Sequence, residues 1–264
     1  MKKITISDLF AMKNKQKIVM ITAYDALFAK LFDDYADMIL VGDSLNMSFN
    51  GKNETIGLSV KEMIYHAKAV RTGSKRAFLV VDVPFGAIYS KKVALKNCIE
   101  IYKKTGCDAV KIEGGSEIKG IVKALSQNGV GVMGHIGLKP QLSRKEGGFK
   151  VAGRDEETAK KILDDALELE LAGAGLLLLE GIPSELGKKI TNSVKIPTIG
   201  IGAGSDTDGQ VLVWSDAFGF FEEFKPKFVK RFLDGANLIR NAMQDYADEV
   251  RIKKFPSSEH EYTK

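Results

Sequence analysis

Acidic side chains recur where short apolar segments end. An isolated acid at such a position would cap the next helix. Several acids at such positions indicate a shared site if the segments are parallel strands of one barrel, because all C-terminal strand ends then meet at one opening. Carboxylates about 4 Å apart repel by roughly 4 kcal/mol at an effective dielectric near 20, so a cluster must bind protons or a cation. Oxygen ligands favour Mg²⁺. The residues in question are Asp43, Asp82, Glu113 and Glu180, with His135 ending a further segment.

A lysine accompanies these acids. Lys111 and Glu113 are two positions apart in AVKIE (109–113), so in a strand both side chains point to the same face. A lysine inside a barrel needs an anionic partner. That partner is either a neighbouring acid, in a structural ion pair, or a substrate carboxylate, and the sequence leaves both open.

The histidines and glycine-rich segments allow further interpretations. His66 lies in a segment with helical spacing and is interpreted as structural, whereas His135 at a strand end is either a substrate contact or a structural hydrogen-bonding residue. GIGAG (200–204), with Gly202 at its centre, lacks the Rossmann spacing, but it could hold phosphate at a barrel mouth. GIPSELGKK (181–189) does not match a P-loop, because its spacing and last residue are wrong.

Eight apolar segments predict the strands that position these residues. Continuous apolar segments of this length are typical of strands buried on both faces of a parallel sheet. The predicted strands are residues 18–22, 38–41, 78–81, 109–112, 130–133, 175–179, 197–201 and 211–214.

Segments with helical spacing separate most of these strands, and a last helix is predicted over residues 228–246. Eight strands interleaved with helices predict an α/β fold, a single-domain (β/α)₈ TIM barrel, over an open doubly wound sheet. We expect the barrel over residues 1–250 and a flexible tail over 251–264. Cys98 falls on an apolar helix face and is expected to be buried.

Two connections are long for a barrel, residues 44–59 and 136–154. Both follow the C-terminal end of a strand, which is where barrel enzymes carry their sites. We therefore expect these connections to cover a substrate.

Composition narrows the class of protein. The chain has 264 residues, 44% of them hydrophobic, and a net charge of +5 that is scattered along the sequence. We expect no nucleic-acid partner and no membrane span, because charged stripes and long apolar runs are lacking. The two cysteines, Cys98 and Cys107, are too few for a disulfide framework, and this favours a cytoplasmic location.

The residues by themselves thus predict a barrel with a carboxylate-bound divalent metal and a nearby lysine. A metal chelated by the keto and carboxylate oxygens of a 2-oxo acid would stabilise an enolate, so such a site suits chemistry on 2-oxo acids.

At these positions the chain resembles the ketopantoate hydroxymethyltransferase (3-methyl-2-oxobutanoate hydroxymethyltransferase) family, from about residue 5 to 232. The resemblance implies a (β/α)₈ barrel, one Mg²⁺ per subunit and a homo-oligomer. The implied substrates are 3-methyl-2-oxobutanoate and 5,10-methylenetetrahydrofolate. The motifs that carry it are MITAYD, VGDSL, VDVPFG, VKIEGG, GHIGLKPQ, LLLLEGIP, IPTIGIGAG and DGQVLV.

The resemblance also implies roles for individual residues. Asp43 and Asp82 would bind the metal directly, with Glu113 as a further ligand. Ser44 and Lys111, together with Asp43 and Asp82, would hold the oxo acid. Glu180 would be the general base, and His135 and Gly202 are candidate substrate or folate contacts.

The chain departs from the family pattern beside several motifs. None of these changes removes an implied ligand or base, and the sequence leaves open their effect on the loops and the folate contacts. They are Asn46 for glycine, Ala87 for serine, Lys139 for threonine and Thr207 for cysteine.

Two other functions compete with this interpretation. One is a metal-dependent barrel lyase or aldolase that acts on 2-oxo acids without folate. The other is a catalytically silent barrel that serves as a binding subunit. Retention of the self-repelling acid cluster argues against the second.

Overall fold

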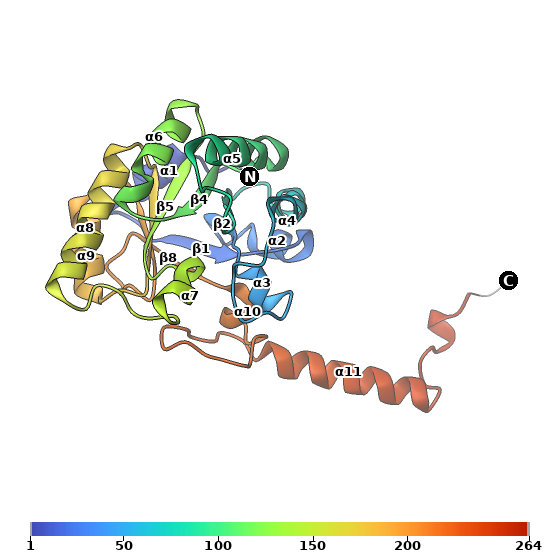
Figure 1. Cartoon of the computed structure of the whole chain (residues 1–264). Helices are drawn as coiled ribbons and strands as arrows, with labels where there is room; N and C mark the ends of the chain where they lie inside the picture. Colours follow the sequence, from blue (N-terminus) through green and yellow to red (C-terminus); the bar gives the residue numbers. More distant parts are fainter. Residues whose placement is uncertain (1, 263–264) are drawn as a thin grey trace. The chain divides into compact units, whose positions relative to one another are not determined.

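The computed structural model describes residues 2–262, and in them eight parallel strands close into a barrel (Figure 1). Each strand pairs with its neighbours along the chain, and β8 closes the barrel by pairing with β1. The predicted (β/α)₈ barrel is therefore confirmed, and the open sheet is excluded. The strands are β1 (Ile18–Thr22), β2 (Met38–Val41), β3 (Phe78–Asp82), β4 (Ala109–Glu113), β5 (Val132–Gly137), β6 (Leu176–Glu180), β7 (Thr198–Ile201) and β8 (Gly209–Leu212).

Helices occupy most of the connections between these strands. Local sequence sets several helix ends: Ser59 and Glu62 form a capping box at the start of α4, and Gly106 ends α5 in the left-handed conformation, with φ 64°. The α-helices are α1 (Ile6–Met12), α2 (Ala26–Phe32), α3 (Leu45–Ser48), α4 (Val60–Gly73), α5 (Lys91–Thr105), α6 (Lys119–Gln127), α7 (Ser143–Glu146), α8 (Glu156–Leu171), α9 (Ser184–Ser193), α10 (Trp214–Ala217) and α11 (Gly235–Arg251); the 3₁₀ helices are η1 (Ser116–Ile118), η2 (Pro140–Leu142) and η3 (Ser258–His260).

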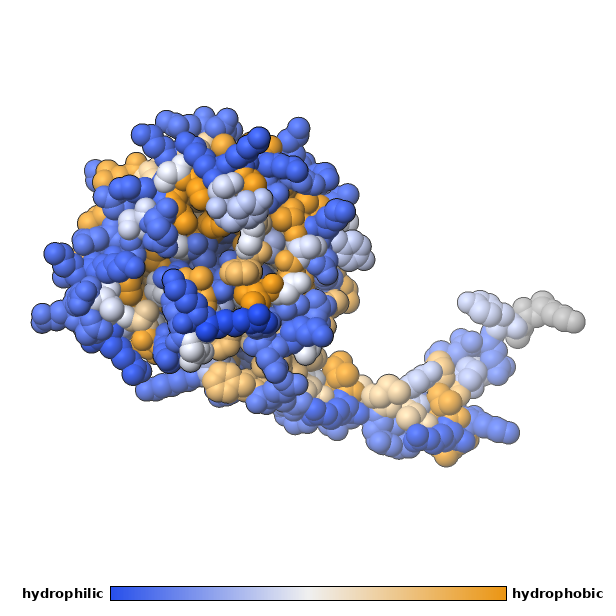
Figure 2. Space-filling model, in the orientation of Figure 1, coloured by the Kyte–Doolittle hydropathy of each residue, from blue (hydrophilic) through white to orange (hydrophobic). Residues whose placement is uncertain are grey.

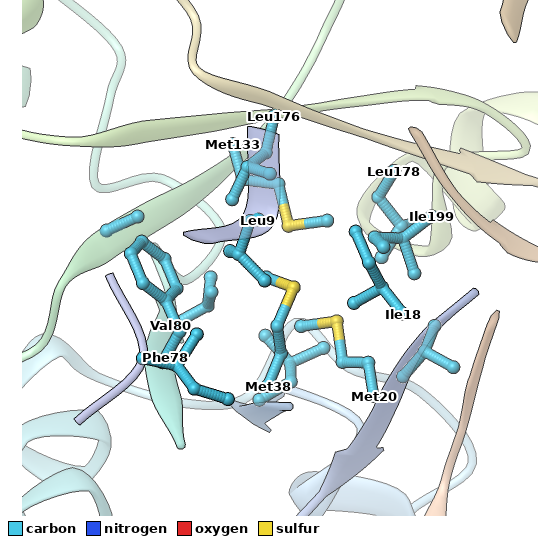
Figure 3. Packing of buried hydrophobic residues seen from close by; sticks show 14 of the residues in the cluster. Leu9, Ile18, Met20, Met38, Phe78, Val80, Met133, Leu176, Leu178 and Ile199 are labelled. Atoms are coloured by element: carbon cyan, nitrogen blue, oxygen red, sulfur yellow. The ribbon is translucent and has the colours of Figure 1, made fainter. Parts of the chain in front are cut away.

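Apolar side chains fill the barrel interior at its N-terminal end. Residues from several strands point toward one another, and Leu9 of α1 packs among them (Figure 3). Phe78 and Val80 of β3 and Leu176 and Leu178 of β6 belong to this cluster. Because side chains alternate along a strand, the next residue on the same face is Asp82 in β3 and Glu180 in β6. The core at the bottom of the barrel therefore fixes which polar side chains enter its mouth.

The two long connections carry short helices. Residues 44–59 contain α3, and residues 136–154 contain η2 and α7. Arg144 of α7 forms a two-pronged ion pair with Glu54 of the first connection, through Nε to Oε2 at 2.7 Å and through Nη2 to Oε1. Two segments far apart in the sequence are thereby joined.

The chain divides into two compact units, residues 1–213 and residues 214–264. The first contains all eight strands. The second contains α10, α11 and η3, and among its described residues α11 exposes apolar side chains, visible as orange atoms in Figure 2. The expected division into a barrel over 1–250 and a flexible tail over 251–264 stays a prediction, and residues 263 and 264 lie outside the described residues.

Some predicted boundaries are wrong. The last helix begins at Gly235 rather than at residue 228, because backbone hydrogen bonds from Phe232 N to Ala217 O and from Gly235 N to Phe218 O hold the preceding segment out of a helix. Strand β5 covers residues 132–137 instead of 130–133, and β8 covers 209–212 instead of 211–214. The buried position predicted for Cys98 is confirmed.

In the described part of the chain, no helix combines the length and the hydrophobicity that a membrane span requires.

Candidate active site

The predicted site residues lie at the C-terminal ends of neighbouring strands. Asp82, Glu113 and Glu180 are the last residues of β3, β4 and β6, and Asp43 follows β2 by two residues. Strand register places Asp82 beside Lys111 and Glu113 beside His135. The convergence inferred from spacing is therefore present in the structure.

A continuous set of contacts joins four of these side chains. Lys111 Nζ lies 3.1 Å from Asp82 Oδ1 and 3.0 Å from His135 Nδ1. His135 Nε2 in turn lies 3.2 Å from Glu180 Oε2. An ammonium group has no acceptor, so Nδ1 must accept the Lys111 hydrogen bond, and the neutral imidazole carries its proton on Nε2, facing Glu180.

Backbone and hydroxyl groups hold the adjoining residues. The Asp43 N–H donates to Asp82 Oδ2 at 2.9 Å. Ser44 Oγ lies 2.9 Å from the Tyr24 hydroxyl, and Tyr24 is 1% exposed. His66 Nδ1 contacts the Tyr24 carbonyl at 2.7 Å, which agrees with the structural interpretation of His66. Apart from its place in the motif MITAYD, no pattern in the sequence singles out Tyr24.

Gln141, which was not among the predicted site residues, contacts two of the carboxylates. Its side-chain amide donates to Asp43 Oδ2 at 2.7 Å and to the Val83 carbonyl at 3.0 Å. Its backbone N–H donates to Glu113 Oε2 at 3.1 Å. Gln141 lies in GHIGLKPQ, and membership of that motif was the one signal that could have found it.

Burial sets the charge state of the carboxylates. Asp43, Asp82 and Glu113 are 3%, 2% and 8% exposed. Burial, reinforced by the charge of Asp82, raises the pKa of Asp43 to about 7. Burial also raises the pKa of Asp82 above its ordinary value and that of Glu113 well above it, although Lys111 opposes both shifts. The cluster is therefore short of positive charge.

Burial and neighbouring charges also shift the pKa values of Lys111, His135 and Glu180. Burial opposes the charged form of Lys111, but the charges of Asp82, Glu113 and Asp43 outweigh it and raise its pKa. Burial, followed by the charges of Lys111 and Lys139, lowers the pKa of His135 well below its ordinary value. Burial raises the pKa of Glu180 to about 8.

These carboxylates fit a magnesium ion in part. Glu113 Oε1 is a buried oxygen with no hydrogen-bond partner in the structure, so it is available to a ligand, whereas Asp82 Oδ1 faces the Lys111 ammonium at 3.1 Å. Among the described residues, no group of three or more histidine, cysteine or acidic side chains is arranged to enclose a metal by itself. Magnesium is usually held by one or two carboxylates, with water and substrate supplying the other oxygens, so an open site of this kind suits it.

Gly202 follows β7 at the same end of the barrel, and its carbonyl accepts the Ile182 N–H at 3.2 Å. This contact joins the segments after β7 and β6 and does not involve the acid cluster.

The departures from the family pattern have identifiable partners. Asn46 is buried and donates to the Glu54 carbonyl at 2.7 Å, and Thr207 Oγ1 donates to the Gly209 carbonyl at 2.8 Å. Ala87 is buried in the β3–α5 connection, and the charge of Lys139 acts on His135.

Solved structures share the fold at low sequence identity. A phosphonopyruvate hydrolase, solved as a complex with oxalate and Mg²⁺, aligns with a TM-score of 0.63 and 13% identity over 98% of this chain and 93% of its own. A 2,3-dimethylmalate lyase of the PEP mutase/isocitrate lyase superfamily aligns with a TM-score of 0.62 and 15% identity over 100% of this chain and 89% of its own. These likenesses concern the fold alone.

Sequence relatives are far more similar. A 3-methyl-2-oxobutanoate hydroxymethyltransferase of Campylobacter fetus subsp. fetus (strain 82-40) is 70% identical over 264 residues, which is 100% of both chains. Enzymes of the same name from Aliarcobacter butzleri (strain RM4018) and Helicobacter pylori (strain HPAG1) are 55% and 56% identical over 98% and 99% of this chain and 97% of their own. Residues 3–258 match the model of one family. The chain therefore belongs to the ketopantoate hydroxymethyltransferase family, whose members are enzymes that transfer a hydroxymethyl group.

Proposed function

We propose that this enzyme transfers a hydroxymethyl group from 5,10-methylenetetrahydrofolate to 3-methyl-2-oxobutanoate in a Mg²⁺-dependent reaction. The product is 2-dehydropantoate (ketopantoate), an intermediate of pantothenate and coenzyme A biosynthesis. The observation that carries the proposal is a buried, self-repelling set of carboxylates at the barrel mouth, in which Glu113 Oε1 has no hydrogen-bond partner.

Asp43 and Asp82 would hold the Mg²⁺, with Glu113 as a further ligand. The chemistry supplied by such an ion is polarisation of the keto group of an oxo acid, which acidifies the adjacent C3–H. The phosphonopyruvate hydrolase of the same fold was solved with oxalate and Mg²⁺. Oxalate has adjacent carboxylate oxygens, as a 2-oxo acid has adjacent keto and carboxylate oxygens.

Lys111 and Ser44 would orient the oxo acid. The Lys111 ammonium is held between Asp82 and His135, so it presents a fixed positive charge beside the cluster. The Ser44 hydroxyl is fixed by Tyr24. A charged donor and a neutral donor in fixed positions suit the carboxylate of a small oxo acid.

Glu180 would remove the C3 proton, a role that typically contributes about 10² to 10⁴-fold to the rate. It is the last residue of β6, and its Oε2 faces His135 Nε2. The charge of Lys111 favours the charged form of Glu180 that a base requires, while burial and the charges of Asp43 and Asp82 oppose it and raise its pKa. In this assignment His135, 3.2 Å away, helps to position the base.

The carbanionic C3 would then attack the methylene carbon of the folate. Both carbon–nitrogen bonds of that methylene group break and water supplies the hydroxyl oxygen, so that 2-dehydropantoate and tetrahydrofolate are released. Orientation of the two substrates contributes as much here as acid–base chemistry does. His135 and Gly202 stay candidates for a substrate or folate contact, and the connections 44–59 and 136–154 for the cover of the site.

We also infer a cytoplasmic homo-oligomer. Both cysteines are free and buried, as suits a reducing compartment. The α11 face formed by Leu238, Ile239, Met243, Tyr246 and Val250 is between 42% and 60% exposed. An apolar helix face of this size favours contact with a second copy of the chain. Light scattering of wild type and Met243→Glu tests this, since the variant should shift toward smaller species.

Deuterium exchange tests the central chemistry. 3-Methyl-2-oxobutanoate is incubated with the enzyme in D₂O, with Mg²⁺ or with EDTA, and loss of the C3 proton is followed by NMR. Methylenetetrahydrofolate is then added, and 2-dehydropantoate is measured. We expect Mg²⁺-dependent exchange without folate and product only with it.

Each other outcome would support a different function or a mechanism without a metal. Exchange without product would favour a lyase or aldolase acting on 2-oxo acids. Absence of exchange with any divalent metal would favour a silent binding subunit. Exchange that is unaffected by EDTA would remove the metal from the mechanism.

A further inference from the structure

Gln141 touches two of the carboxylates from a different part of the chain. It lies in η2, within the long connection that follows β5, whereas Asp43 follows β2 and Glu113 ends β4. We propose that Gln141 is a positioning residue that fixes which oxygens of Asp43 and Glu113 face the cation. The inference rests on the proposed Mg²⁺ site and adds a residue to which the family resemblance assigned no role.

The hydrogen bonds divide the carboxylate oxygens into two sets. Asp43 Oδ2 accepts from Gln141 Nε2 at 2.7 Å, and Glu113 Oε2 accepts from Gln141 N at 3.1 Å. Glu113 Oε1 is buried without a hydrogen-bond partner in the structure. Gln141 thus engages one oxygen of each carboxylate and leaves the other for a ligand.

The amide is fixed by both of its protons. Gln141 Nε2 donates to Asp43 Oδ2 and to the Val83 carbonyl, at 2.7 and 3.0 Å. Val83 directly follows Asp82, so one nitrogen atom links the segments after β2 and β3. A carboxylate at position 141 could not donate either bond and would repel Asp43.

The contacts of Gln141 with the carboxylates differ from a contact that only anchors the connection 136–154 to another segment. The same connection is anchored to the 44–59 connection by the exposed side chain of Arg144, which contacts Glu54. If Gln141 acts on the ligands themselves, its loss should affect cation affinity. Loss of the Arg144 anchor should not.

The test compares Gln141→Met with Arg144→Met. Methionine keeps the length and volume of glutamine but removes both amide protons, and it leaves the backbone N–H that donates to Glu113. Mg²⁺ binding to the purified full-length chain is measured by titration calorimetry. The Mg²⁺ dependence of C3 exchange is measured in parallel, and circular dichroism verifies folding.

We expect Gln141→Met to bind Mg²⁺ about 10- to 100-fold more weakly than wild type, as is typical for the loss of an outer-shell partner. At saturating Mg²⁺ its exchange rate should return close to the wild-type rate, because the base is unchanged. A general packing defect would lower that rate at every Mg²⁺ concentration. Arg144→Met should keep the wild-type affinity.

Three results would overturn the inference. Wild-type affinity in Gln141→Met would refute it alone and leave the proposed function standing. Equal weakening in Arg144→Met would assign the effect to anchoring of the connection. A wild-type chain that binds no divalent cation would overturn the proposed cofactor and this inference together. If Gln141→Met does not fold, Gln141→Ala is used in its place.

Discussion

The Asp43→Asn variant should make the metal-free protein more stable than the wild type above neutral pH. Asp43 is buried, and its side chain accepts a hydrogen bond from Gln141. Asparagine has nearly the same shape, and its carbonyl oxygen can accept the same bond. The substitution therefore removes a desolvated charge while preserving the packing around it.

The pKa shift gives the size of the effect. The pKa of Asp43 rises from 3.8 to about 7, chiefly through burial and then through the charge of Asp82. An acid whose pKa is raised on folding stabilises the folded state below its unfolded pKa, and this contribution is lost as the pH rises through its folded pKa. A shift of about three units corresponds to about 4 kcal/mol. The loss should extend from about pH 4 to pH 7 and be complete at pH 8.

Thermal and urea unfolding in EDTA at pH 4 and pH 8 measure this difference. At pH 8 the variant should melt about 10 °C above the wild type, while at pH 4 the two should nearly coincide. Mg²⁺ at about a hundred times its Kd should add about 2.7 kcal/mol to the wild type. It should add much less to the variant, because one proposed ligand is lost.

Asp33→Asn is a control for which we expect the opposite change in stability. It is also buried, and burial opposes its charge, but hydrogen bonds from Ala77 N, Ser74 Oγ and Lys75 N outweigh burial and lower its pKa. Asp33→Asn should therefore destabilise the protein at pH 8. If Asp43→Asn were equally destabilising there, Asp43 would not be a strained charge, and the reasoning from the acid cluster to a cation would be refuted.

Three further sets of substitutions test the general base, the hydroxyl group beside Ser44 and the ion pair between the two long connections. Glu180→Gln should slow C3 exchange by about 10² to 10⁴-fold with little change in oxo-acid affinity, measured by NMR exchange and calorimetry; an unchanged rate would assign the base elsewhere. Tyr24→Phe removes the hydroxyl beside Ser44 and should weaken oxo-acid binding by about 1 kcal/mol, about fivefold in Kd, with Mg²⁺ affinity retained; wild-type Kd would show that Ser44 needs no such partner. Exchanging the partners in Glu54→Arg/Arg144→Glu should restore most of the stability that either single change costs in urea unfolding, and additive losses would contradict a direct interaction.

Strands buried on both faces were the most predictable part of the fold. In β2 and β3 every residue is buried, and the apolar run marks the strand almost to the residue. β8 was displaced because it begins at Gly209, which carries no hydropathy signal. A Cβ there would lie 2.5 Å from the Ile18 carbonyl, so close approach of β1 explains this glycine. Pairing with a neighbouring strand decided the boundary, and a single-sequence pattern does not contain that information.

Interruptions of the apolar runs at the barrel mouth made one strand boundary wrong but also identified the site residues. Gly134 and His135 ended the apolar run of β5 at Met133, although the strand continues through His135 to Gly137, where it pairs with Glu180. The same interruptions were what identified the site. Gln141 could not be found in this way, because its role depends on the path of a connection between strands and not on alternation within one.

The free energy associated with Asp43 also bears on whether the barrel binds a cation. A buried carboxylate with a pKa of about 7 costs the metal-free fold about 4 kcal/mol above neutral pH, a large part of the net stability of an ordinary domain. Asparagine would avoid that cost at the same position. Lys111 offsets only part of it, because its ammonium already pairs with Asp82 and its charge leaves the pKa of Asp43 raised. The carboxylate is therefore explained by a ligand that carries positive charge, and a barrel that bound no cation would be more stable without it.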